Sequence, residues 1–190
     1  MHKHFKIFKP YGFLSQFRSS QRTRRNKKML GELGNFPAET MAIGRLDEDS
    51  EGLLLLTTDG KVSAEITGSK VQKEYYVQVD GIIGTNEIQE LKEGVSISIN
   101  GKNYKTKPCR AFILDPAPVF PPRSKPIRDS RHGPTSWISV TLTEGKFRQV
   151  RKMTAAVGFP TLRLVRVRVG NEKLEDMTPG EVREVPNFKY

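Results

Sequence analysis

The sequence predicts an α+β protein with a mainly antiparallel or mixed sheet and short helices. Short runs of β-branched and aromatic residues alternate with Gly, Pro and Asn turns, and stretches with helical spacing are few and brief. The chain has 190 residues, 36% of them hydrophobic, which suits one compact domain or two intimately fused lobes, with enough apolar residues for a core. We therefore expect one catalytic or binding domain over residues 1–190.

The first third of the chain predicts strands and one helix. Residues 3–17 should form two extended pieces, because Pro10 and Gly12 demand a turn between them. Leu53–Leu56, flanked by glycines, favours a strand covered on both faces over a helix too short to be stable. Asp59 is the expected N-cap of a short helix that follows it.

The middle of the chain predicts a meander of antiparallel strands. Residues 73–79 have strand composition, and residues 94–99 alternate strictly before an Asn-Gly turn. Extended chain is expected over 102–114 and again over 137–142, with a brief helix over 86–91.

The last third predicts a helix followed by a strand. Phe147, Val150, Met153 and Val157 repeat at helical spacing, as expected for the inward face of a helix. The strand over 162–169 changes the phase of its apolar positions near its centre, which a bulge or a two-sided environment would explain.

The charge of the chain favours a polyanionic partner. Subtracting 21 acidic from 32 basic side chains gives +11, and clustered cations displace counterions from phosphates, so nucleic acid leads over an anionic membrane. Residues 16–28 hold six Lys or Arg and no acid, and residues 115–136 combine six prolines with four Lys or Arg. Both should be long basic loops; the first is equally well a solvated loop or one that grips phosphates.

Targeting and metal signals are weak. No apolar run is long enough to cross a bilayer and the N-terminus lacks a signal-peptide core, so we expect a cytoplasmic protein without a membrane partner. Cys109 is the single cysteine and no zinc-ligand spacing occurs, so no metal site is predicted. A monomer is expected because no heptad pattern stands out.

Asp47 is the first candidate for chemistry. It lies in a Gly-flanked loop that leads into the leucine run, where its carboxylate is either a structural cap or ion-pair partner or a catalyst. Its acidic neighbours Glu48, Asp49 and Glu51 invite a divalent-metal interpretation, but they lack the spaced ligands of a calcium loop.

A second candidate is the cationic start of the predicted C-terminal helix. Cations at a helix N-terminus oppose the helix dipole by about 0.3–1 kcal/mol each, so a phosphate or a carboxylate should compensate them; a solvated helix face is the alternative. Tyr75 and Tyr76 should point to opposite faces of their strand. The cations are Lys146, Arg148, Arg151 and Lys152.

Taken together, these segments resemble the group of ribosomal RNA pseudouridine synthases that comprises type A, which acts on small-subunit RNA, and types B, E and F, which act on large-subunit RNA. The resemblance is strongest to type E. The block that starts at Gly44 is highly specific. The segments are KPYG at 9–12, GRLDEDSEGLLLLTTDG at 44–60, KEYYV at 73–77, EGKFRQVRKM at 144–153, LRLVRVRVG at 162–170 and PGEVREV at 179–185.

The resemblance implies a pseudouridine synthase catalytic fold, with long basic loops around a central cleft and no S4 domain. It implies site-specific isomerisation of a flipped-out uridine in ribosomal RNA, with the large-subunit 23S RNA as partner. No cofactor is implied, because the isomerisation conserves every atom.

The resemblance also implies roles for individual residues. Asp47 would be the catalytic aspartate, Tyr75 would stack on the target base, and Arg151 would pair with the aspartate. Leu164 would line the pocket for the RNA base. The residues that would contact RNA phosphates are Arg45, Lys73, Arg148 and Lys152.

Two other functions remain open at this stage. One is a non-catalytic, basic RNA-binding factor of ribosome assembly. The other is a metal-dependent nuclease that uses the acidic cluster around Asp47.

Overall fold

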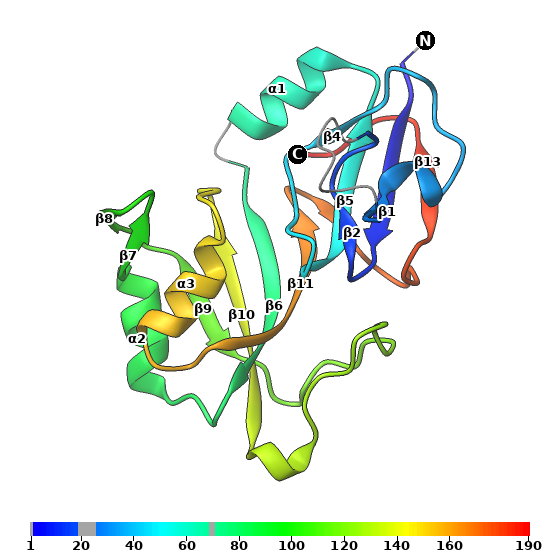
Figure 1. The fold of residues 1–190 in the computed structure, drawn as a ribbon. Coiled ribbons are helices and arrows are strands. Elements are labelled where there is room, and N and C mark those ends of the chain that lie inside the picture. The colour runs from blue at the N-terminus through cyan, green and yellow to red at the C-terminus, as the bar shows by residue number, and fades with distance from the viewer. Residues whose placement is uncertain (1, 19–25, 69–70) are drawn as a thin grey trace. The chain divides into compact units, whose positions relative to one another are not determined.

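The computed structural model describes residues 2–18, 26–68 and 71–190 and divides the chain into two compact units (Figure 1). The first unit comprises Met1–Val71, Pro121–Lys125 and Arg166–Tyr190, and the second comprises Gln72–Phe120 and Pro126–Val165. Each unit combines sheet and helix, which confirms the α+β class. The single catalytic domain over residues 1–190 stays a prediction.

The first unit is built on a sheet in the order β13-β1-β5-β11, with β4 paired to β5 and β12 to β11. The pairings of β1 with β5 and β13, and of β4 with β5, are antiparallel, and Ile7 lies opposite Leu54. β11 contributes to both units, because the boundary falls after Val165. The strands are β1 (His4–Lys9), β4 (Met41–Ile43), β5 (Glu51–Thr57), β11 (Thr161–Val169), β12 (Glu172–Lys173) and β13 (Val182–Val185).

Three short elements and helix α1 complete this unit. The turn expected near Pro10 and Gly12 and the helix cap expected at Asp59 are both present. β2 (Phe13–Leu14) follows the predicted turn and pairs in parallel with β3 (Lys28–Met29), and η2 (Leu30–Glu32) comes next. The cap of α1 (Gly60–Gly68) is Asp59, whose Oδ1 accepts the backbone N–H of Lys61 at 2.9 Å. Residues 19–25 of the basic loop predicted over 16–28 lie outside the described residues.

β5 is buried along its whole length, which confirms the strand covered on both faces. The side chains of Leu53–Leu56 are at most 1% exposed. Gly52 has φ +104°, and a Cβ added there would lie 2.3 Å from the carbonyl oxygen of Arg166. Arg166 in turn donates its Nε to the carbonyl of Leu53 at 2.8 Å. Only glycine fits at this point of β5, where the backbone of the neighbouring strand β11 comes so close.

The second unit contains a sheet in the order β11-β6-β10-β9, a β7–β8 hairpin and two helices. β10 pairs antiparallel with β6 and β9, and Ile138 lies opposite Val77. The elements are β6 (Lys73–Asp80), α2 (Thr85–Glu93), β7 (Ser96–Ile99), β8 (Lys102–Lys105), β9 (Arg110–Ile113), β10 (Thr135–Leu142) and α3 (Gln149–Ala156).

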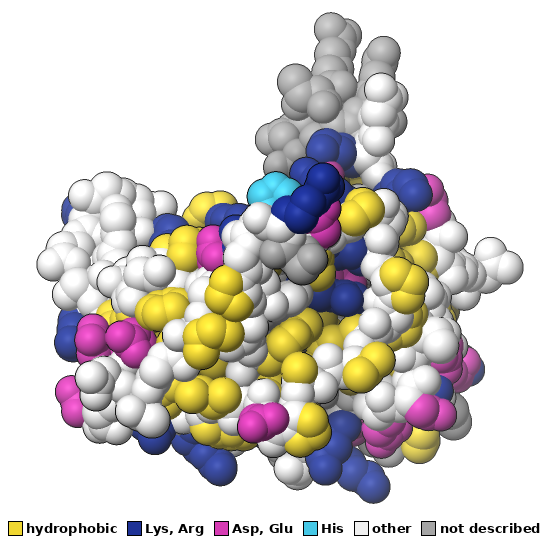
Figure 2. All heavy atoms as spheres, turned by 90° about the horizontal axis from the view of Figure 1, so that it is seen from below, with side chains coloured by type: hydrophobic (Ala, Val, Ile, Leu, Met, Phe, Trp, Pro, Cys, Tyr) yellow, Lys and Arg dark blue, Asp and Glu magenta, His cyan; other side chains and the backbone are white. Residues whose placement is uncertain are grey.

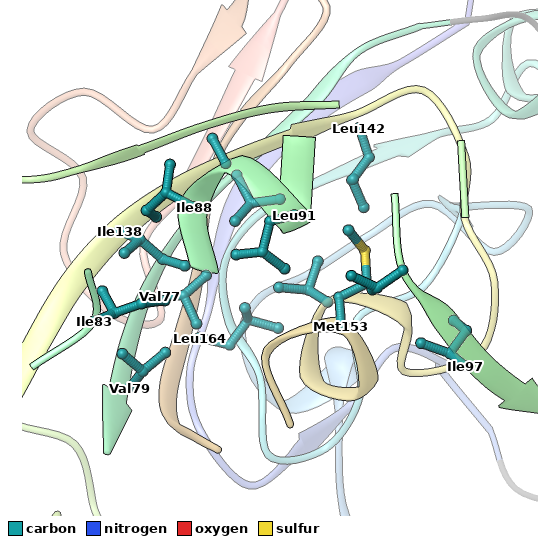
Figure 3. Close-up of a cluster of buried hydrophobic side chains, with 14 residues drawn as sticks. Val77, Val79, Ile83, Ile88, Leu91, Ile97, Ile138, Leu142, Met153 and Leu164 are labelled. Carbon is teal, nitrogen blue, oxygen red and sulfur yellow. The ribbon is translucent and has the colours of Figure 1, made fainter. Parts of the chain in front are cut away.

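One hydrophobic cluster joins these elements. Ile88 and Leu91 of α2, Met153 of α3, and Val77 and Ile138 of the sheet belong to this cluster (Figure 3). Figure 2 shows that hydrophobic side chains also reach the surface, where they lie among Lys and Arg. In the part of the chain that the structure describes, no helix is long and apolar enough to cross a membrane.

Two predictions for this unit need correction. The extended run expected over 102–114 is broken after Thr106, because Lys107 and Cys109 donate their backbone N–H groups to the Glu144 carboxylate and the Lys92 carbonyl instead of to a neighbouring strand. Phe147 does not belong to the inward face of a helix: α3 begins at Gln149, and Phe147 is 65% exposed.

Two other predictions are confirmed. Residues 115–136 form the expected loop up to the start of β10, with only the short η3 (Ser130–His132) inside it. The phase change in β11 reflects a two-sided environment, because the four consecutive residues from Arg163 to Arg166 are all buried.

Gly52→Ala should destabilise the fold strongly. The new methyl group must displace the backbone of Arg166, and an alanine at position 52 must keep a positive φ that L-residues avoid. The free energy of unfolding, measured by urea titration, should therefore fall by about 2–4 kcal/mol. Gly60→Ala is the control, since a Cβ at Gly60 meets nothing within 4 Å. Equal stability of the two variants would contradict the close approach of the Arg166 backbone to residue 52.

Candidate functional site

The loop that carries Asp47 connects β4 to β5 in the first unit and is fixed by hydrogen bonds. Ser15 Oγ accepts the N–H of Leu46 at 2.9 Å and donates to the carbonyl of Leu46 at 2.7 Å. The N–H of Ser50 donates to the carbonyl of Asp47 at 3.0 Å. Asp47 is half-buried. The loop therefore holds a carboxylate in a defined place, between two paired strands.

Lys9 lies close to this loop and is completely buried. Its Nζ donates to the carbonyls of Pro10 at 3.0 Å and Phe13 at 2.7 Å. Burial lowers the pKa of Lys9 to about 7, against the opposite effect of the nearby carboxylates of Glu51, Asp49, Asp47 and Glu48. The acidic cluster is thus neighbour to a buried amine that titrates near neutrality.

The other charged residues of the loop differ in their surroundings. Arg45 is exposed, and Glu48 forms an ion pair with Lys27 at 2.7 Å. Among the described residues, no group of three or more His, Cys, Asp or Glu side chains is placed to hold a metal ion.

β6 brings two predicted residues into the second unit. Lys73 begins the strand opposite Leu142, and Tyr75 is half-buried and packs against the hydrophobic cluster. Tyr76 lies on the alternate face, where its ring centroid is 6.3 Å from that of Phe120. Leu164 of β11 is only 5% exposed and belongs to the same hydrophobic cluster as Val77 (Figure 3).

Glu144 organises the turn that precedes α3. Its carboxylate accepts the Tyr104 hydroxyl, the N–H of Lys107 at 2.9 Å and Nε2 of Gln149 at 2.6 Å. Burial alone would raise the pKa of Glu144, but these hydrogen bonds outweigh it and hold the pKa below its ordinary value. These partners do not include the four cations of the helix start, so the group that compensates those cations stays a prediction.

Gln149 closes this turn. Its backbone N–H donates to the carbonyl of Lys146 at 3.1 Å, and its Oε1 accepts the N–H of Lys146 at 3.0 Å. Between them, Arg148 adopts left-handed dihedrals, φ 52° and ψ 34°, at the N-cap of α3. Sequence reasoning missed Glu144 and Gln149 as organising residues, because Tyr104, the partner of Glu144 in β8, is 40 residues away in the chain.

The cations of α3 have different surroundings. Arg151 is half-buried in the first turn of the helix. Lys152 donates its Nζ to the carbonyl of Ser98 at 2.7 Å, and that nitrogen lies 5.3 Å from the centre of the Phe147 ring.

The predicted site residues are divided between the two units. Arg45 and Asp47 belong to the first unit. Their grouping with the others in one centre stays a prediction. The second unit holds Lys73, Tyr75, Arg148, Arg151, Lys152 and Leu164.

Comparison with known proteins defines the class. The sequence model of the RNA pseudouridylate synthase family matches residues 3–156, a range that includes the Asp47 loop, β6 and α3. The chain belongs to this family. The expected resemblance is thereby confirmed, and the fold is shared: a crystal structure of a pseudouridylate synthase superposes with a TM-score of 0.76 at 27% identity, over 97% of this chain and 70% of that one.

Two curated relatives share much of their sequence with this chain. The chain is 46% identical over 173 residues to the ribosomal large subunit pseudouridine synthase E of Xanthomonas axonopodis pv. citri, covering 90% of this chain and 87% of that protein. It is 42% identical over 180 residues to the synthase E of Vibrio parahaemolyticus, covering 93% of this chain and 71% of the relative.

Lys9→Met should change how stability depends on pH. Between about pH 7 and 10.5 the folded protein has lost the Lys9 proton while the unfolded chain retains it, so wild-type stability gains relative to the variant as pH rises. The gain should be roughly 1 kcal/mol per pH unit above pH 7. Urea titrations of both proteins from about pH 6 to pH 9 measure it; a constant difference would contradict the shifted pKa.

Proposed function

We propose that this protein isomerises a specific uridine of large-subunit ribosomal RNA to pseudouridine. The observation that carries the proposal is the family match over residues 3–156, supported by 42–46% identity to relatives named ribosomal large subunit pseudouridine synthase E. The non-catalytic assembly factor is not favoured, because relatives aligned with 90% or more of this chain are named as synthases.

The proposed reaction exchanges one bond of the nucleotide for another. The N1–C1′ glycosidic bond breaks, the detached uracil turns, and a C5–C1′ bond forms. The proton on C5 is released and N1 gains a proton, so the isomerisation is balanced without an added group. Both carbons lie inside stacked RNA, so the uridine must first flip out of its helix or loop.

Asp47 is the proposed catalytic group. A half-buried carboxylate on a loop fixed by Ser15 and β5 needs little reorganisation when charge develops on the sugar or base. Arg151 is the proposed partner that directs this carboxylate toward the nucleotide.

The proposed binding groups combine apolar surface with cations. Tyr75 presents an aromatic ring for the flipped base, and Leu164 supplies apolar surface. Phosphate contacts give affinity and register rather than base identity. The cations proposed for these contacts are Arg45, Lys73, Arg148 and Lys152. We further propose that the enzyme acts as a monomer in the cytoplasm.

Asp47→Asn should abolish the chemistry and spare binding. The amide keeps the shape of the side chain but loses the negative charge, so tritium release from C5-labelled uridine in ribosomal RNA should fall at least about 100-fold. RNA affinity should change less than about twofold. Glu48→Gln, one residue along the same loop, is the matched control and should keep wild-type release. Substantial turnover by Asp47→Asn would refute the proposed role.

RNA binding should weaken steeply with salt. Each phosphate contact releases about 0.7 of a counterion on a single strand, so Lys73→Ala should lower the slope of log K against log[salt] by about 0.7. Filter binding between roughly 50 and 200 mM KCl measures the slope. A slope identical to that of the wild type would remove Lys73 from the set of phosphate contacts.

A further inference from the structure

The turn before α3 presents an aromatic ring that the proposed chemistry does not use. Phe147 is 65% exposed, and the Nζ of Lys152 lies 5.3 Å from its ring centre. Lys146 and Arg148 are its neighbours in the chain. A single exposed apolar side chain is ordinary on a protein surface. Phe147 differs from such side chains because hydrogen bonds fix the turn that carries it.

Two hydrogen bonds between Lys146 and Gln149 close the turn that contains Phe147. The backbone and the side chain of Gln149 both bond to Lys146, and Phe147, which lies between them in the chain, is exposed. Arg148 takes a left-handed conformation to close it, with φ 52°. Apart from Asn and Asp, residues with a side chain rarely adopt this conformation. The backbone strain that it causes persists only where the surroundings impose it.

A side-chain network centred on Glu144 imposes this conformation. Glu144 accepts Nε2 of Gln149 at 2.6 Å and the N–H of Lys107 at 2.9 Å, and it also accepts the hydroxyl of Tyr104. Gln149 is 4% exposed. The turn is thus tied to β8, and Phe147 is held in place rather than left on a loose loop. A ligand that meets a preformed ring loses less entropy on binding.

We propose that Phe147 is a stacking platform for an unpaired base of the RNA substrate. The inference rests on the proposed function for the identity of its ligand. Aromatic rings take any nucleobase by stacking, and cations beside the ring meet the phosphates that flank that base. The cations around Phe147 favour RNA over an apolar protein segment, because burying these charges in an apolar interface would cost their hydration.

The test measures binding of a single-stranded RNA of about 12 nucleotides to the wild type and four variants. Phe147→Ala should weaken binding about 5- to 100-fold, and Phe147→Leu should do the same, because leucine restores apolar area but no ring. Phe147→Trp should bind at least as tightly as the wild type. Phe112→Ala is the matched control: Phe112 is 44% exposed on β9 of the same unit, and its loss should leave affinity unchanged.

The salt dependence separates stacking from charge. Phe147→Ala should keep the wild-type slope of log K against log[salt], since no cation is removed. Binding by Phe147→Ala within about twofold of the wild type, or full binding by Phe147→Leu, would overturn the stacking role. A urea titration with unchanged midpoint shows that the variant is folded.

Turnover distinguishes this inference from the proposed function. With ribosomal RNA as substrate, Phe147→Ala should raise KM by a similar factor and leave kcat within about twofold. If the wild-type protein releases tritium and Phe147→Ala has an unchanged KM, the stacking site is wrong and the function stands. If the wild type releases none but Phe147→Ala still weakens binding of the 12-nucleotide RNA, the function is wrong and the stacking site stands.

Discussion

The complete burial of β5 is the constraint on which the rest of the first unit depends. A strand without an exposed residue admits one register, because a shift by one residue would exchange its two faces against different neighbours. Ile43 of β4 lies opposite Leu55 of β5, so the intervening loop starts and ends at fixed points. Gly52 allows the backbone of Arg166 to approach at the first residues of the strand. These contacts fix the position of the loop that carries Asp47.

An unusual buried group also lies close to this loop. A lysine that is fully buried costs free energy, and Lys9 offsets part of that cost by donating to the carbonyls of Pro10 and Phe13. Its depressed pKa means that the charge near the acidic cluster changes close to neutral pH. In the second unit the corresponding role falls to Glu144, which remains a carboxylate and organises the approach to α3. Both groups fix a short segment that precedes proposed functional side chains.

Local signals predicted the elements whose causes are local. The leucine run, the Asp59 cap and the Asn-Gly turn each depend on a few consecutive residues, and each lies where it was expected. Phe147 was misplaced because helical spacing alone ignores the bonds of Gln149 to Lys146 and Glu144. The break after β8 arises from the bonds of the Lys107 and Cys109 N–H groups to Glu144 and Lys92, which the periodicity of the run does not reveal. Asp47 was singled out by its motif; its side chain is half-buried, and its catalytic role stays a prediction.

Mapping pseudouridine in ribosomal RNA from cells with and without this protein tests the proposed isomerase activity most directly. One or a few sites in the large-subunit RNA should lose pseudouridine when the protein is absent, and the rest of the map should be unchanged. An identical map in both cells would contradict the assignment of the isomerase activity to this chain.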